Sequence, residues 1–527
     1  MTTGTILISL GIGLGVVLLF LIGFVFLKTA LFTVPQKDVP PRALAEVDGK
    51  SVAERLGLAI QYKTIANQDH EKMDSTAFWG LHRLLKTLYP QVHGQLNVEE
   101  VNDYSLLYTW LGTNPELEPI MLTAHLDVVP AVESDESAWT HPPFSGEVAD
   151  GYVWGRGAID DKNAVISILE AVETLIKQNY KPERTIYLGF GHDEEISGWR
   201  GAKAIAELLE SRGEALGALL DEGGAVFEGL FPDIDVPLAF IGISEKGYLS
   251  LRLHVDLEGG HSAMPESETA IGVLSKAIAK LEANPMPAHL EIVEFVMSHL
   301  GGALPFFQRL LVANTWLFGG ILKKRLAKSK MMNAMMRTTT APTIIKGGVK
   351  DNVLPNNAEA VVNFRLLPGD DLKSVYEMVQ KTIGDDRVKI SPLIGDTLEG
   401  KSGFNPSAVA DTGSSYYQEL ARLIQEVFPE GVVSPYLILG ATDARHYTTL
   451  TENCFRFSPM QIDDNELSRM HAADERLSFE NCARMVTFYI AFLQAFGNLV
   501  KEQQVVPEAF ASDEDDLPLP TDFEDEF

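Results

Sequence analysis

Residues 185–195 read TIYLGFGHDEE, an apolar run that passes directly into His192, Asp193, Glu194 and Glu195. The apolar part has the length and composition of a buried β-strand. Three acids in succession at the end of such a strand repel one another unless a cation compensates their charge. A metal ion would supply that cation, with Glu195 as a ligand and Glu194 free to act as a general base. A solvated turn is the alternative interpretation.

Other segments place potential ligands just beyond predicted strands or just before predicted helices. They contain His125 with Asp127 (AHLD), Asp160 (IDDK), Asp221 (LLDEGG) and His471 (RMHAAD). Open α/β sheets carry their sites at the carboxyl ends of strands. Together with Glu195, these side chains suit two zinc ions lying close together. Each motif alone is equally explained as an N-cap, a turn or a chance pairing; jointly they predict a metal centre.

Apolar strands alternate with helical patterns through most of the chain, which favours an α/β fold with helices flanking a mixed sheet. Between residues 247 and 393 the predicted order becomes β-α-β-β-α-β, which is typical of a ferredoxin-like unit. We therefore expect a catalytic domain in two parts, 46–243 and 399–504. A lid or dimerisation domain at 244–398 would be inserted between them.

An apolar and basic helical insert, 288–337, lies inside the predicted lid. It is open whether this insert extends the core, contacts a second subunit or a membrane, or forms a wall for an apolar substrate.

The predicted strands in the body are 105–111, 120–124, 185–190, 218–220 and 436–439, and the predicted helices are 163–178, 201–211 and 416–428. In the lid, strands are predicted at 247–257, 341–347, 358–366 and 388–393, and helices at 269–281 and 372–383.

Length, charge and cysteine content narrow the class of protein. The 527 residues allow two or more domains, and the net charge of −30 excludes a nucleic-acid binder, which needs a basic face. Cys454 and Cys482 are the only cysteines, so a disulfide framework is excluded and two free thiols are expected.

The N-terminal residues 6–27 carry no charge and are long enough to cross a hydrocarbon core as a helix. The run is too long for a signal-peptide core and lacks a clear cleavage site, so we expect a single-pass membrane anchor. Residues 28–45 are expected to be a linker and the acidic residues 508–527 a disordered tail. Basic residues follow the span and none precedes it, which by itself favours a cytoplasmic body.

The motifs HLDVVP, GRGAIDDK, GHDEE, LDEG, GGHSAMP and GATDAR resemble those of the co-catalytic zinc amidohydrolases, a family that includes aminoacylase and carboxypeptidase S. The resemblance covers about residues 45–500. The insert and the N-terminal span are most similar to the branch of carboxypeptidase S and the N-fatty-acyl-amino-acid synthase/hydrolases. The resemblance implies a zinc metallopeptidase or amidohydrolase that cleaves an amide bond to a C-terminal amino acid. Short peptides and N-acyl amino acids are the implied substrates.

The resemblance also implies residue roles in the catalytic domain. One zinc ion would be bound by His125 and Asp221, the other by Glu195 and His471, with Asp160 bridging both. The same likeness implies that Asp127 orients His125, that Glu194 deprotonates the attacking water, and that the Asp160–Asp161 peptide is cis.

In the lid, the resemblance implies that His261 steadies the oxyanion in the partner's site of a homodimer. Asn352 and Arg365 would hold the substrate carboxylate, and Gly440 would contact substrate. Relatives generally work outside the cytosol, so the resemblance implies an extracytoplasmic catalytic domain, against the charge pattern.

Two alternatives of another class remain: a peptide-binding pseudoenzyme, and a bimetallic aminopeptidase that recognises a free amine. The pseudoenzyme would lack Glu194 or a ligand, and the aminopeptidase would need neither Arg365 and Asn352 nor the inserted lid.

Overall fold

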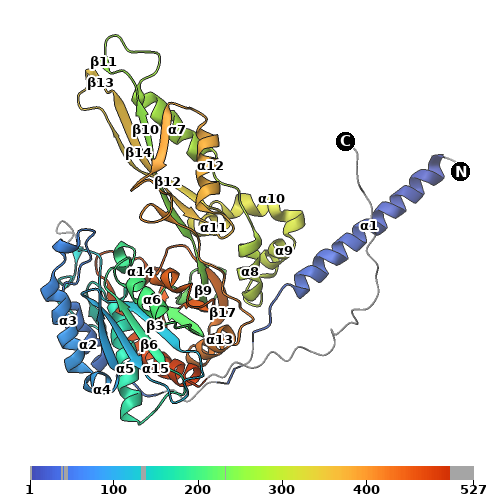
Figure 1. Cartoon of the computed structure of the whole chain (residues 1–527). Coiled ribbons are helices and arrows are strands. Elements are labelled where there is room, and N and C mark those ends of the chain that lie inside the picture. The colour runs from blue at the N-terminus through green and yellow to red at the C-terminus, as the bar shows by residue number, and fades with distance from the viewer. Residues whose placement is uncertain (1–2, 37–38, 41–44, 132–137, 232, 499–527) are drawn as a thin grey trace, which may run out of the picture.

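The computed structural model describes residues 3–36, 39–40, 45–131, 138–231 and 233–498. It has a sheet-based body, a narrower β-rich domain that rises from it, and a long N-terminal helix that projects from the side (Figure 1). The expected tail, 508–527, lies outside the described residues, as do parts of the expected linker and residues 499–504 of the expected catalytic domain.

A ten-stranded mixed sheet forms the centre of the body. Its strands are β1 (Asn97–Val101), β2 (Ser105–Trp110), β3 (Ile120–His125), β6 (Ile186–Gly191), β7 (Ala218–Asp221), β8 (Val226–Glu228), β9 (Leu238–Glu245), β17 (Val432–Ile438), β18 (Cys454–Arg456) and β19 (Gln461–Asp463). The order is β1-β2-β6-β3-β7-β18-β9-β8-β19, with β17 paired to β9. Strands β6, β3, β7 and β18 run parallel, so their carboxyl ends meet at one edge.

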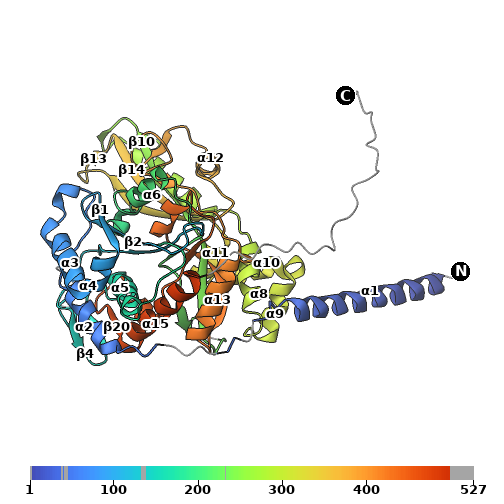
Figure 2. The ribbon, with the colours of Figure 1, turned by 60° about the horizontal axis from the view of Figure 1, so that its bottom comes forward.

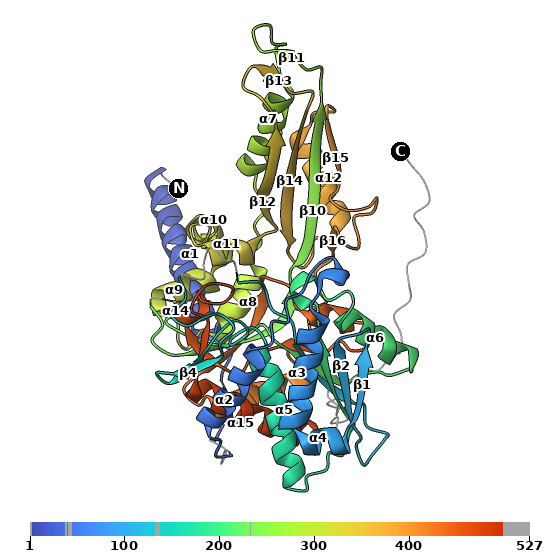
Figure 3. The same ribbon diagram turned by 90° about the vertical axis from the view of Figure 1, so that its left-hand side faces the viewer.

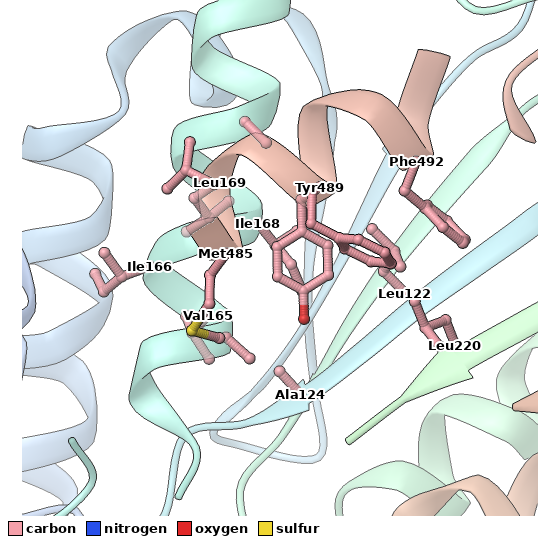
Figure 4. Packing of buried hydrophobic residues seen from close by; sticks show 14 of the residues in the cluster. Leu122, Ala124, Val165, Ile166, Ile168, Leu169, Leu220, Met485, Tyr489 and Phe492 are labelled. Carbon is pink, nitrogen blue, oxygen red and sulfur yellow. The ribbon is translucent and has the colours of Figure 1, made fainter. Parts of the chain in front are cut away.

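Helices cover this sheet. They are α2 (Gly49–Ile60), α3 (Ser75–Leu88), α4 (Pro90–Gln95), α5 (Lys162–Lys177), α6 (Ala202–Ser211), α13 (Ser415–Val427) and α15 (Phe479–Phe496). Figure 4 shows α5 and α15 side by side on one face, where Ile168 and Tyr489 pack against Leu122 of β3 and Leu220 of β7. Each fully buried aliphatic side chain of this kind contributes about 1.5–3 kcal/mol, so the core holds the strand ends in fixed positions.

The second domain contains β10 (Gly247–Asp256), α7 (Ala270–Ala283), β12 (Thr339–Gly347), β14 (Asn357–Leu366), α12 (Leu372–Ile383) and β15 (Val388–Pro392). Its strands pair antiparallel in the order β12-β14-β10-β15, which is the ferredoxin-like arrangement expected for β-α-β-β-α-β. Helix α12 begins at a capping box on Asp371 and ends at Gly384, whose left-handed conformation glycine adopts without strain.

The two ends of this lid differ. At its far tip, β11 (Gly260–His261) pairs with β13 (Val353–Leu354), well away from the body in Figures 1 and 3. At its base, β16 (Gly403–Phe404) pairs with the first residues of β10, where the chain leaves the body.

The helical insert consists of α8 (Glu291–His299), α9 (Phe306–Ala313), α10 (Thr315–Leu326) and α11 (Lys330–Met336). Although it lies within the predicted lid in sequence, it packs on the body, since Val293 and Val296 share a core with Phe240 of β9 and Tyr436 of β17. Helix α1 (Thr3–Leu31) extends outward from this insert (Figure 2) and is long and apolar enough to cross a membrane.

The remaining elements are a small sheet of β4 (Glu147–Ala149), β5 (Tyr152–Trp154) and β20 (Arg476–Ser478), helix α14 (Asp464–Leu467), and the 3₁₀ turns η1 (His70–Lys72), η3 (Glu194–Ile196) and η4 (Asp443–Tyr447). The predicted elements are present with shifted ends: 372–383 coincides with α12, whereas the strand expected at 436–439 begins four residues earlier, at Val432. Cys454 and Cys482 are buried free thiols, as expected.

Candidate active site

The carboxyl ends of three parallel strands converge on one point of the body. His125 is the last residue of β3, η3 follows β6 and carries Glu194 and Glu195, and Glu222 follows the last residue of β7. Asp160 enters from the loop before α5, and His471 from the loop before β20.

Two groups of donor atoms form there, and Asp160 belongs to both. His125 Nε2 lies 2.9 Å from Asp160 Oδ1 and 3.4 Å from Glu222 Oε1. On the other side, His471 Nε2 lies 2.8 Å from Asp160 Oδ2 and 3.4 Å from Glu195 Oε1. Within each group the donor atoms lie within 4.8 Å of one another, which suits an ion held by nitrogen and oxygen at about 2.0–2.2 Å. The donor set fits a divalent metal ion, and Asp160 offers an oxygen to each group.

The charges of the residues in the two donor groups also favour a bound cation. Burial raises the pKa of Glu222 to about 8, and the neighbouring Asp160 carboxylate adds to this effect. Hydrogen bonding to Asp160, and then to Glu195, raises the pKa of His471 to about 10. The clustered carboxylates therefore favour positive charge between them, and a bound cation supplies it without the need for protons.

A buried carboxylate organises the loop that presents Asp160. The side chain of Glu475 accepts hydrogen bonds from the backbone N–H groups of Gly157 (2.9 Å) and Ile159 (2.8 Å), and it pairs with Arg156 at 2.5 Å. Gly157 has a φ of +91°, which suits glycine at this turn. The Asp160–Asp161 peptide is cis, as the resemblance implied.

Asp127 connects the two strand ends behind the donors. Its backbone carbonyl lies 2.9 Å from His125 Nδ1, and its carboxylate Oδ1 lies 3.4 Å from the same nitrogen. The carboxylate also accepts from the backbone N–H groups of Glu194 (3.2 Å) and Glu195 (3.1 Å). It thereby holds the ring of His125 with Nε2 toward the donor groups.

The end of β7 carries two acids in succession, Asp221 and Glu222. Asp221 belongs to neither donor group; its Oδ2 instead accepts from the backbone N–H of Ala444 at 2.7 Å. The neighbouring Glu222 faces His125. Both acids lie in the LDEG motif, and successive residues at a strand end point to opposite sides. The sequence therefore located this strand end, and which of its two acids binds a metal ion stays a prediction.

Glu194 lies beside the donor groups without joining either of them. Burial raises the pKa of its carboxyl group well above the ordinary range; the charge of His125 opposes this shift, and that of Glu222 adds to it. A raised pKa beside a donor cluster is typical of a carboxyl group that accepts and returns protons as a general base.

The lid residues are divided between the two ends of that domain. His261 in β11 and Asn352 just before β13 are exposed together at the tip, where Ser262 N–H donates to the Asn352 carbonyl at 3.4 Å. Arg365 lies at the base, opposite Tyr248 in β10. The expected pairing of Asn352 with Arg365 around one carboxylate is therefore not formed within a single chain.

A second arginine, Arg445, approaches the base of the lid. Its guanidinium lies 4.4 Å from the ring centre of Phe404 and donates to the Ser197 carbonyl, next to η3, at 2.5 Å. The guanidinium of Arg365 lies 5.0 Å from the ring centre of Tyr248. Burial lowers the pKa of Arg365, and the charge of Arg445 adds to this effect. Gly440, between β17 and η4, is exposed.

This arrangement defines a metal-dependent hydrolase with an inserted α+β domain. Residues 121–495 match peptidase family M20/M25/M40, and the chain belongs to that family. It is thus an enzyme that hydrolyses amide bonds, of the carboxypeptidase S-like kind.

Relatives and solved structures agree with this assignment. The chain is 40% identical to probable carboxypeptidase S-like 2 of Dictyostelium discoideum, over 88% of this chain and 89% of that protein. It is 41% identical to N-fatty-acyl-amino acid synthase/hydrolase PM20D1 of Xenopus tropicalis, over 86% and 87% respectively. Human carnosine dipeptidase 1 shares the fold with a TM-score of 0.60 at 17% identity, over 87% of this chain and all of that one.

Proposed function

We propose that this enzyme uses two zinc ions to release a C-terminal amino acid from short peptides or N-acyl amino acids. The observation that carries the proposal is the pair of donor groups that share Asp160, with Glu194 beside them. His125, Asp160 and Glu222 would hold one ion, and Asp160, Glu195 and His471 the other. Asp221, which the resemblance named as a ligand, would support the site through Ala444.

The chain's own residues then divide the work. When bound, the metal ions activate a water molecule and polarise the substrate carbonyl. Glu194 takes the proton of the attacking water on its carboxylate and returns it to the leaving nitrogen. Asp127 keeps the His125 ring oriented and ties Glu194 and Glu195 to the same strand end.

Substrate recognition would rest on positive charge at the base of the lid. Arg365 and Arg445 are stacked on Tyr248 and Phe404, respectively, which leaves their planar guanidinium groups suited to a carboxylate. The free α-carboxylate of the leaving amino acid is the proposed ligand. Gly440, the other proposed contact to substrate, borders open space, since a Cβ added there would meet no atom within 4 Å.

Completion of the site would require a second subunit. His261 and Asn352 lie at the lid tip, far from the donor groups of their own chain (Figures 1 and 3). In a homodimer formed through the lid domains, each tip would reach the partner's site, where His261 would stabilise the oxyanion.

The proposed location is a membrane, with α1 as a single span and the catalytic domain on the extracytoplasmic side. The length and composition of α1 support the span. A C-terminal reporter active only in the cytoplasm would test the orientation, and a working reporter would place the domain in the cytosol.

The test is an assay of the purified full chain with Gly-Xaa dipeptides, N-acetyl amino acids and long-chain N-acyl amino acids, with metal content measured in parallel. Glu194→Gln should retain two zinc ions and lose about 10²–10⁴-fold in kcat. Glu116→Gln, an exposed surface change, is the matched control and should be unaffected. Retained activity in Glu194→Gln would refute the proposed general base.

A further inference from the structure

The last turns of α1 do not hang free but pack against the helical insert. Asn314, which is fully buried between α9 and α10, donates to the Val25 carbonyl at 3.3 Å and to Thr29 Oγ1 at 3.1 Å. The rings of Phe24 and Trp316 lie 5.9 Å apart, and those of Phe26 and Phe306 lie 6.0 Å apart. The junction of α9 and α10 is therefore tied to the C-terminal end of α1.

The chain beyond α1 continues along the same insert. The backbone N–H of Val34 donates to the Ser298 carbonyl at 3.0 Å, and Gln36 Nε2 donates to the carbonyls of His299 and Val433, both at 3.1 Å. Helix α1 thus joins the body through a series of contacts with α8 to α10, which limits how far the two can tilt apart.

The contacts begin at the height where a membrane would end. Residues 6–27 of α1, the predicted anchor, form a helix of about 33 Å at 1.5 Å per residue, which is enough to cross a hydrocarbon core of about 30 Å. The residues that touch the insert, from Phe24 to Thr29, lie at the end of that span. If residues 6–27 cross the core, α9 and α10 lie at the level of the lipid headgroups.

The exposed surface of α9 and α10 has the composition that is typical of the headgroup region of a membrane. Large apolar side chains remain exposed there: Phe306 (50%), Phe307 (64%), Trp316 (50%), Leu317 (45%) and Ile321 (65%). Aromatic side chains accumulate at membrane interfaces, and interfacial helices combine such residues with lysine and arginine.

The charge of the insert is opposite to that of the rest of the protein. Residues 306–337 contain seven lysines and arginines and no acid, within a chain of net charge −30. Lys323, Lys324 and Arg325 begin two residues after Ile321. Basic side chains are attracted to anionic lipid headgroups, which counteracts repulsion between the acidic body and the lipid surface.

We propose that the face formed by Phe306, Phe307, Trp316, Leu317 and Ile321 is a second membrane contact that lies in the phospholipid headgroup region beside α1. The continuity of this face with α1 and its complementary charge identify the bilayer as the occupant. The inference rests on the proposed span of α1. This second contact holds the catalytic body at a fixed height and tilt above the membrane that α1 crosses.

The test places a single fluorescent label in the full chain, which the two buried native cysteines permit. Ile321→Cys is labelled with an environment-sensitive dye, and the protein is reconstituted in phosphatidylcholine vesicles with or without phosphatidylglycerol. Leu14→Cys (72% exposed, in α1) reports the span, and Val349→Cys (98% exposed, in the lid) reports bulk water. Hydrolytic activity of each labelled protein verifies its fold.

The expected result is a blue-shifted Ile321 label that is quenched by lipids carrying a nitroxide near the headgroup, while the Val349 label is not quenched. If the Leu14 label is quenched and the Ile321 label behaves like the Val349 label, the second contact is refuted and the span stands. If the Leu14 label also remains in water, both the span and this contact fail. Lys323→Glu/Lys324→Glu should weaken the Ile321 quenching on phosphatidylglycerol vesicles; no change would remove the charge component of the proposal.

Discussion

The catalytic body and the tip of the lid hold functional residues in opposite ways. In the body, residues from five separate segments meet within hydrogen-bonding distance, because parallel strands deliver their ends to one edge of the sheet. At the tip, His261 and Asn352 lie side by side at the short two-stranded sheet of β11 and β13 but far from those residues. A sheet edge can complete a metal site by itself, whereas a projecting tip serves a site only through movement or a second subunit.

The largest effect should come from the residue on which the body site depends. Asp160→Ala removes the only side chain common to both donor groups, so we expect loss of both metal ions and of measurable activity. The loss should exceed the roughly 10²–10⁴-fold expected from removing the general base. Metal analysis after dialysis checks this, with the exposed Glu116→Ala as control. Two retained ions would show that Asp160 is not the bridge.

The next effect tests the tip. His261→Ala should keep both metal ions but lose about 10²–10³-fold in kcat, the usual cost of removing an oxyanion donor. Hybrid dimers of His261→Ala with Glu194→Gln distinguish the two ways of completing the site. If the tip acts on the partner, one site of each hybrid is intact, and about half of the wild-type activity should return. No recovery would mean that the lid closes onto its own body.

The same contrast shows what the sequence could predict. The run TIYLGFGHDEE and the motifs with it were sufficient to predict the strands, the α/β class and the segments that carry the donor residues, because each signal is local. The ferredoxin-like order of the lid followed from its strand and helix pattern. Local signals could not choose between Asp221 and Glu222, because one residue of uncertainty at a strand end reverses which side chain faces the site.

The separation of Asn352 from Arg365 could not be predicted for a different reason. The two are thirteen residues apart in sequence, but β13 and most of the extended strand β14 lie between them, so they occupy opposite ends of the lid. Likewise, the insert sits inside the lid in sequence yet packs on the body, because its apolar faces bury against β9 and β17. Such long-range packing leaves no local pattern.

A smaller effect should separate the two acids at the end of β7. Glu222→Gln removes a charged ligand and should weaken the binding of one of the two metal ions by at least about 100-fold, the upper limit for residues that only orient a ligand. Asp221→Asn keeps an oxygen that can accept from the Ala444 N–H, so metal affinity should change little. Metal titration of the two variants checks this, with one ion retained in the first and two in the second. The reverse pattern would restore Asp221 as the ligand.

The smallest effect concerns the base of the lid, where Arg365 lies near both the body and the aromatic ring of Tyr248. Arg365→Lys keeps the charge but removes the planar fork that binds a carboxylate through two hydrogen bonds. We expect KM to rise about tenfold for substrates with a free α-carboxylate, since one charge-assisted bond is worth about 1.5–3 kcal/mol at most. Substrates with an amidated C-terminus should show no change.

Arg252→Lys is the matched control for this variant. Arg252 lies in β10 of the same sheet and pairs with Glu359 at 3.6 Å, toward the tip, so KM should stay at the wild-type value for both substrates. An equal loss on the free and the amidated substrate in Arg365→Lys would indicate that Arg365 supports the lid rather than the substrate. A loss confined to the free carboxylate would assign the base of the lid to substrate binding and leave the tip for the transition state, which is the division of labour that the two ends of the domain suggest.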